Sequence, residues 1–128
     1  MKFWCATAFM TTNELVHIAH LLDQAGYHGL LISDHLVYPR ELVSKYPYSP
    51  HPDGRPIWAP ETSWPDPWVL IGAMSSVTTQ LHFTTNIYSA GHRPILQVAK
   101  EVATAAVLSN GRVALGVERR LAGDADKV

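Results

Sequence analysis

Two residues that can move or hold a proton stand side by side directly after an apolar run. Asp34 and His35 follow the run Gly29–Ser33. A histidine donates or accepts a proton near neutral pH, and a nearby carboxylate can orient its ring. Adjacent residues of a strand point to opposite faces, so the two side chains need not touch each other. The alternative is that Asp34 accepts hydrogen bonds from loop amides while His35 only packs against its neighbours.

A second polar group follows a later apolar run. Asn86 and Ser89 lie at the end of His82–Tyr88, and His92 and Arg93 come a few residues later. A buried amide near a strand end usually has a definite hydrogen-bond partner, here either the backbone or a ligand. The free amides and dipole of a following helix attract anions. Arg93 could therefore hold a phosphate or a carboxylate, or it could form an ordinary ion pair near the helix start.

The segments that must position these residues alternate between two patterns. Four apolar runs, rich in β-branched and aromatic residues, predict strands covered on both faces: Phe3–Phe9, Gly29–Ser33, His82–Tyr88 and Arg112–Val117. Helical spacing and capping residues predict three helices, from Thr12 or Asn13 to Gly26, from Asp66-Pro67 to about Thr79, and from Pro94 to Asn110-Gly111. This alternation predicts an α/β fold with a parallel sheet, in which ligands gather at the carboxyl ends of the strands.

The segment Val37–Pro65 interrupts this alternation. Together with Pro67 it holds eight of the nine prolines, and it carries two tryptophans and three tyrosines. Connections in α/β units normally run about 2–6 residues, and a longer loop is usually functional. The pattern therefore predicts a lid or a binding loop, with a flexible insertion as the alternative.

Composition excludes several classes of protein. With 128 residues, 47% of them apolar and 16% charged, the chain is the size of one globular domain. A net charge of −1 gives no electrostatic reason to expect nucleic acid or an anionic membrane as partner. The single cysteine excludes an internal disulfide and indicates a reducing, cytoplasmic setting. No apolar run approaches the roughly 20 residues that span a bilayer.

Motifs for other chemistry are missing from the sequence. The first predicted strand is not followed by the glycine-rich turn of a dinucleotide-binding crossover, and no Walker loop, HExxH or CxxC pair occurs. His17 and His20 stand three apart on a predicted helix, but they lie on its polar side and no further ligand accompanies them. We therefore expect no metal site.

Taken together, the order and spacing of several short pieces resemble the luciferase-like monooxygenase superfamily of flavin-dependent oxidoreductases. The resemblance covers roughly residues 3–117. The pieces that carry it are Gly29-Leu30-Leu31-Ile32-Ser33-Asp34-His35, Trp64-Pro65-Asp66-Pro67-Trp68, Thr84-Thr85-Asn86-Ile87-Tyr88, His92-Arg93-Pro94 and Leu108-Ser109-Asn110-Gly111-Arg112-Val113-Ala114-Leu115-Gly116-Val117. The long loop rich in Tyr, Pro and Trp is most similar to the deazaflavin-using branch.

The resemblance implies a fold, a coenzyme and a set of roles. Members are (β/α)8 barrels that use FMN or the deazaflavin coenzyme F-420 for hydride transfer or monooxygenation of a small organic substrate. His35 would lie beside the reactive ring as proton donor or ring-positioning residue. A non-proline cis peptide bond, by position Thr85-Asn86, would back the ring, and Asn86 would contact it. The residues expected to line the same mouth are Asp34, Thr85, Ser89, His92 and Arg93.

Two departures from the family pattern shape the expectation. A full barrel needs about 250 residues and eight strands, and this sequence supplies four strands, the first half. After Val117 the family continues with Gly-x-Gly-Trp, whereas Glu118-Arg119-Arg120-Leu121 stands here. We therefore divide the chain into a partial barrel domain, 1–117, and a non-family tail, 118–128, whose ending reads like a truncation or a shifted frame.

These departures lead to an expected function and two alternatives. The chain is expected to be the amino-terminal half of a deazaflavin- or FMN-dependent oxidoreductase, with little or no turnover alone and with open sheet edges through which it could form a homo-oligomer. One alternative is a non-catalytic fragment or assembly partner. The other is a self-contained flavodoxin-like module, which would need a phosphate-binding loop in place of Met10-Thr11-Thr12-Asn13.

Overall fold

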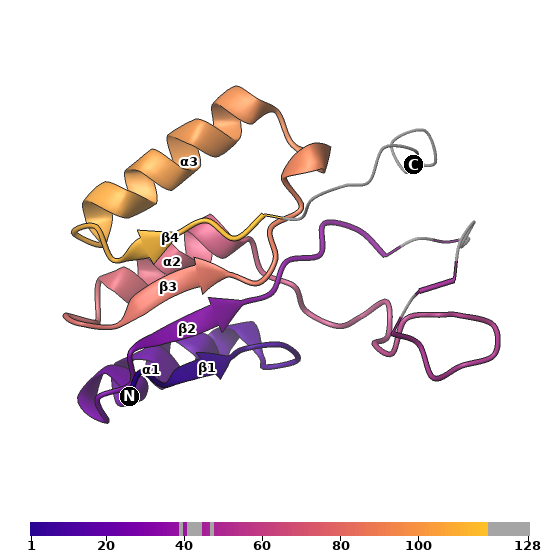
Figure 1. Ribbon diagram of the computed structural model, residues 1–128, viewed down its shortest axis with the longest axis horizontal. Coiled ribbons are helices and arrows are strands. Elements are labelled where there is room, and N and C mark those ends of the chain that lie inside the picture. The colour runs from indigo at the N-terminus through magenta and orange to yellow at the C-terminus, as the bar shows by residue number, and fades with distance from the viewer. Residues whose placement is uncertain (39, 41–44, 47, 118–128) are drawn as a thin grey trace.

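The fold is a four-stranded parallel sheet in which the strands follow one another in chain order. A computed structural model describes residues 1–38, 40, 45–46 and 48–117. The strands are β1 (Trp4–Ala6), β2 (Gly29–Ile32), β3 (His82–Thr85) and β4 (Val113–Ala114), and each pairs in parallel with the next (Figure 1). This is the predicted α/β class, in the sequential order that opens a β/α barrel.

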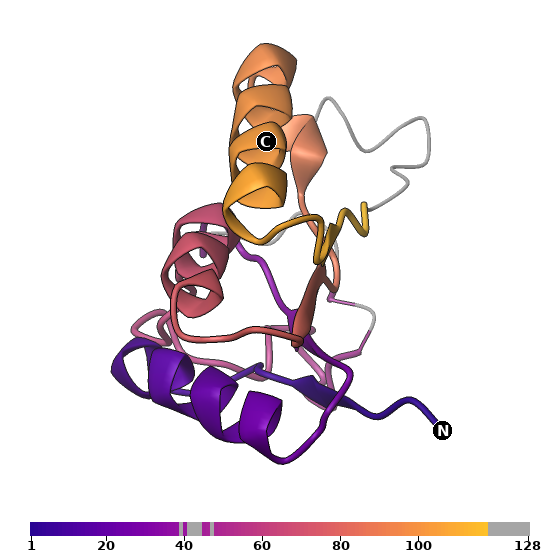
Figure 2. The ribbon, with the colours of Figure 1, turned by 90° about the vertical axis from the view of Figure 1, so that its left-hand side faces the viewer.

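Three helices connect the strands and cover one face of the sheet. They are α1 (Thr12–Gln24), α2 (Pro67–Ser75) and α3 (Ile95–Leu108), and Figure 2 shows them on the same side of the strands. The predicted cap of α2 is confirmed, because the Asp66 carboxylate accepts hydrogen bonds from the two amides at the start of the helix. The predicted end of α1 is also confirmed, since Gly26 has a positive φ of 78°.

Helix α2 is shorter than predicted, ending at Ser75 instead of near Thr79. The Asp23 carboxylate of α1 explains part of this difference. It accepts hydrogen bonds from the amides of Thr79, Gln80 and Leu81 at 2.7–2.9 Å, so these amides are not available to prolong the helix. Burial alone would raise the pKa of Asp23, but the hydrogen bonds outweigh it and the pKa is lowered.

The strands are also shorter than predicted, because the chain leaves the sheet early. β1 ends at Ala6, and Phe9, which the sequence places in the strand, adopts a left-handed φ of 67°. β3 ends at Thr85, one residue before a cis peptide bond. β4 ends at Ala114, and within the described part of the chain a single bridge between Tyr88 and Val117 continues the pairing.

The core lies between the sheet and the helices. It includes large side chains that are at most 5% exposed, from β2, α2, β3 and the segment after it: Leu30, Ile32, Trp68, Ile71, Met74, Phe83 and Tyr88. Alternation along the strands explains which residues enter the core. Leu30 and Phe83 point to the helices, whereas Leu31 and Thr84 point the other way.

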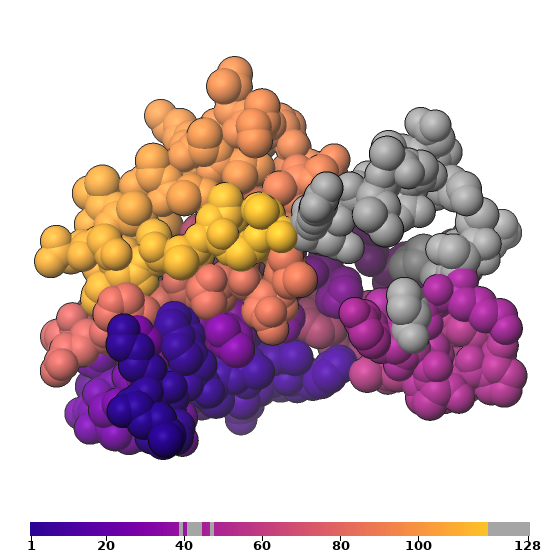
Figure 3. Space-filling model, viewed as in Figure 1, coloured from indigo at the N-terminus to yellow at the C-terminus, as the bar shows by residue number. Residues whose placement is uncertain are grey.

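The second face of the sheet is not covered by the described residues. Paired positions form a row across it, from Ala6 through Leu31 and Thr84 to Ala114. Ala6 and Ala114 at the two ends of the row are exposed. Figure 3 looks onto this side, where the indigo amino-terminal segment and yellow β4 form part of the visible surface. The sequence pattern predicts strands covered on both faces, and the residues that the structure describes cover one.

The long loop after β2 stands at the carboxyl ends of the strands, apart from the helices (Figure 1). Within it, Trp58 is buried, with 9% of its surface exposed. Positions 39, 41–44 and 47 of this loop, and the predicted tail 118–128, lie outside the described residues. In the part of the chain that the structure describes, no helix is long and apolar enough to cross a membrane.

Candidate functional site

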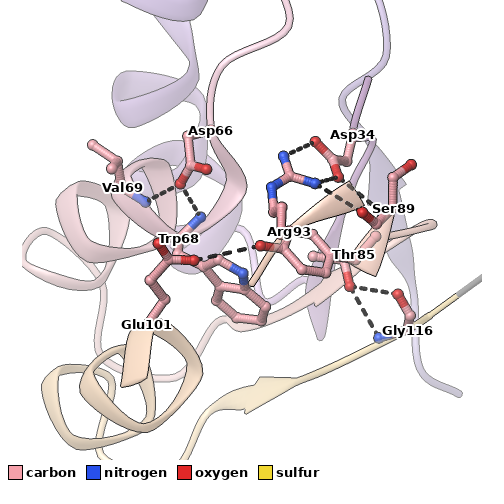
Figure 4. A network of polar contacts seen from close by, with 10 residues as sticks. Asp34, Asp66, Trp68, Val69, Thr85, Ser89, Arg93, Glu101 and Gly116 are labelled. Atoms are coloured by element: carbon pink, nitrogen blue, oxygen red, sulfur yellow. Dashed lines mark hydrogen bonds and ion pairs between the residues drawn. The ribbon is translucent and has the colours of Figure 1, made fainter. Parts of the chain in front are cut away.

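The side chains of Asp34 and Arg93 form a buried ion pair at the carboxyl edge of the sheet. Two parallel hydrogen bonds join them, Arg93 Nη1 to Asp34 Oδ2 at 2.7 Å and Arg93 Nη2 to Asp34 Oδ1 at 2.9 Å (Figure 4). The side chain of Asp34 is 2% exposed and that of Arg93 is 10% exposed. Burial opposes ionisation of the guanidinium, but the ion pair with Asp34 raises the pKa of Arg93 above its usual value. Of the two readings open for Arg93, an ion pair or a ligand contact, the structure shows the ion pair.

The same carboxylate holds the segment between β3 and α3. Its Oδ2 also accepts the backbone amide of Ser89 at 2.9 Å, and Arg93 Nη1 donates to the Ser89 carbonyl oxygen at 3.2 Å. The guanidinium lies 4.4 Å from the centre of the buried Tyr88 ring, close enough for a cation–π contact. Tyr88 Oη in turn reaches Glu101 of α3 at 3.4 Å. One carboxylate at the end of β2 therefore fixes the path of residues 88–93.

Thr85 is buried, and its hydroxyl binds the backbone just after β4. Its hydroxyl donates to the carbonyl oxygen of Gly116 at 2.8 Å and accepts the Gly116 amide at 2.9 Å. A side chain at position 116 would collide with the Thr85 carbonyl oxygen, so this close approach of two backbones requires a glycine. Sequence reasoning did not single out Gly116, although a glycine inside a predicted strand, here Arg112–Val117, is the signal that indicates such an approach.

A non-proline cis peptide bond is present, one residue later than predicted. It joins Asn86 to Ile87 and not Thr85 to Asn86. Thr85 stays in regular pairing with Ile32, so the irregular backbone begins only after it. Asn86 donates its backbone amide to the Ile32 carbonyl oxygen at 2.7 Å, while its side chain and that of Ile87 are exposed. A polar amide and an apolar side chain therefore stand together at the sheet edge.

His35 lies among the rings of the long loop. Its imidazole packs against Trp58, with 4.3 Å between ring centres, and against Trp64, with 4.6 Å. The two indoles meet each other edge to face, and Trp64 also contacts Phe9 from the loop after β1. The sequence predicts a lid or a binding loop over this segment. The spacing of its tryptophans gives no sign that both indoles contact His35.

A small hollow opens in this ring cluster. Its volume is about 180 Å³, and its lining includes His35, Tyr38, Trp58, Thr62 and Trp64. The hydrogen bonds that Asp34 makes with Arg93 and Ser89 place the 88–93 segment beside the strand end from which His35 continues. His92 is exposed on the short 3₁₀ turn Ala90–His92. Four of the predicted site residues lie in the network of Figure 4, namely Asp34, Thr85, Ser89 and Arg93. His35 lies in the ring cluster, and Asn86 and His92 are exposed outside both groups.

Comparison with known proteins adds the family. Residues 4–120 match the profile described as luciferase-like monooxygenase. The chain belongs to this family. Two uncharacterized proteins of Mycobacterium tuberculosis are similar to this luciferase-like chain. One is 35% identical over 117 residues, 91% of this chain and 40% of its own length. The other is 29% identical over 102 residues, 77% of this chain and 34% of its own length.

Solved structures of monooxygenases share the fold of this luciferase-like chain. The monooxygenase RslO1 of Streptomyces bottropensis superposes with a TM-score of 0.67 at 19% identity, over 97% of this chain and 35% of its own. The oxygenating constituent of 3,6-diketocamphane monooxygenase of Pseudomonas putida, solved in complex with FMN, gives 0.69 at 16% identity, over 98% and 31%. The long-chain alkane monooxygenase LadA gives 0.63 at 22% identity, over 91% and 25%.

The chain matches only part of the length of each of these proteins. This chain spans 40% or less of the length of the curated relatives and about a third or less of these solved chains. The four strands described above are therefore equivalent to part of those proteins.

Proposed function

We propose that this chain forms one wall of a flavin-type coenzyme site in an oxidoreductase that uses coenzyme F-420 or FMN. The reaction would be hydride transfer or monooxygenation of a small organic substrate, in the cytoplasm. The observation that carries the proposal is the Asp34–Arg93 pair, because it joins the end of β2 to the irregular segment after β3 at the carboxyl edge of the sheet. Ligands of parallel β/α folds bind at this edge.

The residues at the edge fit a flat ring that has one polar side. The exposed Asn86 amide offers both a donor and an acceptor, and the exposed Ile87 beside it offers an apolar surface. Ser89 and His92 follow on the same segment. We propose that these residues contact the ring, while Thr85, Asp34 and Arg93 hold the backbone that presents them. When bound, the coenzyme supplies the redox chemistry.

His35 is proposed as proton donor or as ring-positioning residue. The indoles of Trp58 and Trp64 restrict the orientation of its imidazole, so the ring is presented in one direction at the edge of the sheet. An imidazole changes its protonation near neutral pH, which suits proton transfer beside a reacting ring. Both carboxylate oxygens of Asp34 are engaged by Arg93, so Asp34 acts here on the backbone after β3.

The same ion pair argues against a phosphate clamp at Arg93. Its guanidinium already pairs with a buried carboxylate, and breaking that pair to bind a phosphate would leave Asp34 uncompensated. We therefore propose that this chain holds the ring of the coenzyme and that phosphate recognition belongs to other parts of the enzyme. Binding by this chain alone is then expected to be weaker than micromolar.

A comparison of coenzymes with and without phosphate tests this proposal. FMN, riboflavin and F-420 are titrated into the 128-residue chain, and binding is followed by ligand fluorescence. FMN and riboflavin are expected to bind with weak affinities within about twofold of each other, because a clamp would add at least one charge-assisted hydrogen bond. Asn86→Ala should weaken all three ligands by about two- to tenfold, the loss of one hydrogen bond.

The matched control is Gln80→Ala, an exposed amide just before the amino end of β3. It should leave every titration unchanged. Micromolar binding of FMN together with much weaker binding of riboflavin would overturn the ring-wall proposal. Equal loss of binding in both variants would do the same.

The uncovered sheet face favours a second candidate function, that of an assembly partner. Ala6 at one end of the row and Ala114 at the other are exposed, and no described strand pairs with the outer edge of β1 or of β4. Unpaired edges bind other strands. We propose that this chain associates through that face and those edges, either with itself or with a chain that carries the remaining strands.

A further inference from the structure

The hollow in the ring cluster after β2 has features of a binding site that differ from those of the coenzyme wall. It lies between the end of β2 and the long loop, with the imidazole of His35 and the indoles of Trp58 and Trp64 around it. Its volume of about 180 Å³ is below the roughly 300–1,000 Å³ of typical ligand pockets, so it suits a small molecule or one end of a larger molecule.

The chemistry of the lining selects against charge. None of the described residues that line the hollow is Asp, Glu, Lys or Arg. Aromatic walls bury flat apolar groups well, whereas a charged group that enters such a site loses its hydration without gaining a counterion. The lining therefore favours an uncharged, flat group.

Polar atoms are present that would orient such a group. Tyr38 and Thr62 each bring a hydroxyl to the lining. A ligand with a carbonyl oxygen would accept a hydrogen bond from either hydroxyl.

We propose that this hollow binds the small, uncharged, carbonyl-bearing end of the substrate, and that Trp58 and Trp64 determine specificity for it. That the bound molecule is a substrate rests on the oxidoreductase function proposed above, but binding in the hollow does not need the coenzyme. The position next to His35 would place the bound group beside the proposed proton donor.

Three molecules of nearly the same shape provide the test. Benzamide is neutral, benzoate is an anion and benzamidine is a cation at neutral pH. Each is titrated into the 128-residue chain, and the indole N–H signals of the four tryptophans are followed by NMR. Benzamide should move the signals of Trp58 and Trp64, while those of Trp4 and Trp68, which do not line the hollow, serve as internal controls.

Benzoate and benzamidine should bind at least about tenfold more weakly than benzamide, because each carries its charge into the aromatic site. Tyr38→Phe keeps the ring but removes a hydroxyl of the lining, and it should weaken benzamide several-fold. Tyr48→Phe changes a residue of the same loop that is 78% exposed and outside the lining, and it should have no effect.

Equal affinity for all three molecules would overturn the proposal. The lack of any shift at Trp58 and Trp64 with benzamide would also overturn it. This outcome covers the case in which benzamide binds instead in a second, larger and more apolar hollow, whose lining includes Val16 and Val77. Benzamide binding at Trp58 and Trp64 in a chain that binds no flavin or deazaflavin would refute the coenzyme wall and keep this site. The reverse result would refute this site alone.

Discussion

At the scale of single residues, Asp34 has the largest influence on the candidate site. Its carboxylate is buried, pairs with Arg93 and accepts the Ser89 amide. The sequence identifies all three residues as candidates, because each follows a strand. It gives no signal that they are partners, since Asp34 and Arg93 are 59 positions apart and only the folded sheet brings them together.

Removing either member of this pair is expected to destabilise the fold. Asp34→Ala and Arg93→Ala should each lower the free energy of unfolding by about 3–5 kcal/mol, because each leaves a buried charge without its partner. The double variant should lose clearly less than the sum of the two. Urea denaturation measures all three values.

The exposed pair Asp53–Arg55 provides the control. Its side chains are 61% exposed and 3.8 Å apart, so Asp53→Ala should cost less than about 1 kcal/mol. Additive losses at Asp34 and Arg93 would show that the two side chains do not interact in solution.

A pair of histidines at the amino ends of β2 and β3 predicts that the stability of the fold depends on pH. The rings of His28 and His82 stack with 4.4 Å between their centres. Burial, and then the charges of Lys2 and His82, lower the pKa of His28 below its usual 6.5. Because the folded state binds this proton less readily than the unfolded state, the stabilising contribution is complete above pH 6.5 and is lost as the pH falls through the lowered pKa.

Urea denaturation between pH 7.5 and 5 tests this dependence. His28→Gln should flatten the fall in stability over that window, and His17→Gln, an exposed position on α1, should not. A fall of the same size in wild type and His28→Gln would contradict the assignment to His28.

At the scale of the elements, local signals were enough to place the helices and strands, but not all of their ends. The caps at Asp66 and Gly26 are properties of a few neighbouring residues, so the sequence predicts them correctly. The end of α2 depends on Asp23, whose carboxylate binds amides 56–58 positions away. A contact of that range leaves no mark in the local pattern, and the prediction extended the helix too far.

Two glycines test the packing of these elements. Gly116→Ala should separate the segment after β4 from the end of β3, because the new methyl group would collide with the Thr85 carbonyl oxygen. We expect a loss of stability of several kcal/mol, or no folded protein. Gly72→Ala, inside α2, meets only Leu108 at 3.9 Å and should stabilise the chain by about 0.5–1 kcal/mol.

Thermal unfolding followed by circular dichroism reports both glycine variants. If Gly116→Ala melts at the wild-type temperature, the backbones of β3 and β4 are not in close contact at that point. Gly72→Ala keeps the experiment informative if Gly116→Ala does not fold.

At the scale of the whole molecule, the uncovered face predicts association. The 128-residue chain should sediment as a mixture that shifts to larger species as its concentration rises, because the described residues leave one face and two edges of the sheet open. Ala6→Lys and Ala114→Lys place a charge at each end of the uncovered row and should shift the chain toward monomer. Gln80→Lys, away from that face, should not.

Sedimentation velocity over a tenfold range of concentration distinguishes the outcomes. A monomer at every concentration would show that the face needs no partner. A single defined dimer that both lysine variants abolish would favour assembly between two copies, and a polydisperse mixture would favour a missing chain that carries further strands.

The order of the strands has a consequence for how the protein is made. Each strand lies beside the one that precedes it in the chain, so β2 docks on β1, β3 on β2 and β4 on β3. A polypeptide built in this way can condense vectorially as it leaves the ribosome, amino-terminal unit first, without waiting for distant segments. Synthesis itself would then lay down the sheet in sequence, with β4 joining after β1, β2 and β3.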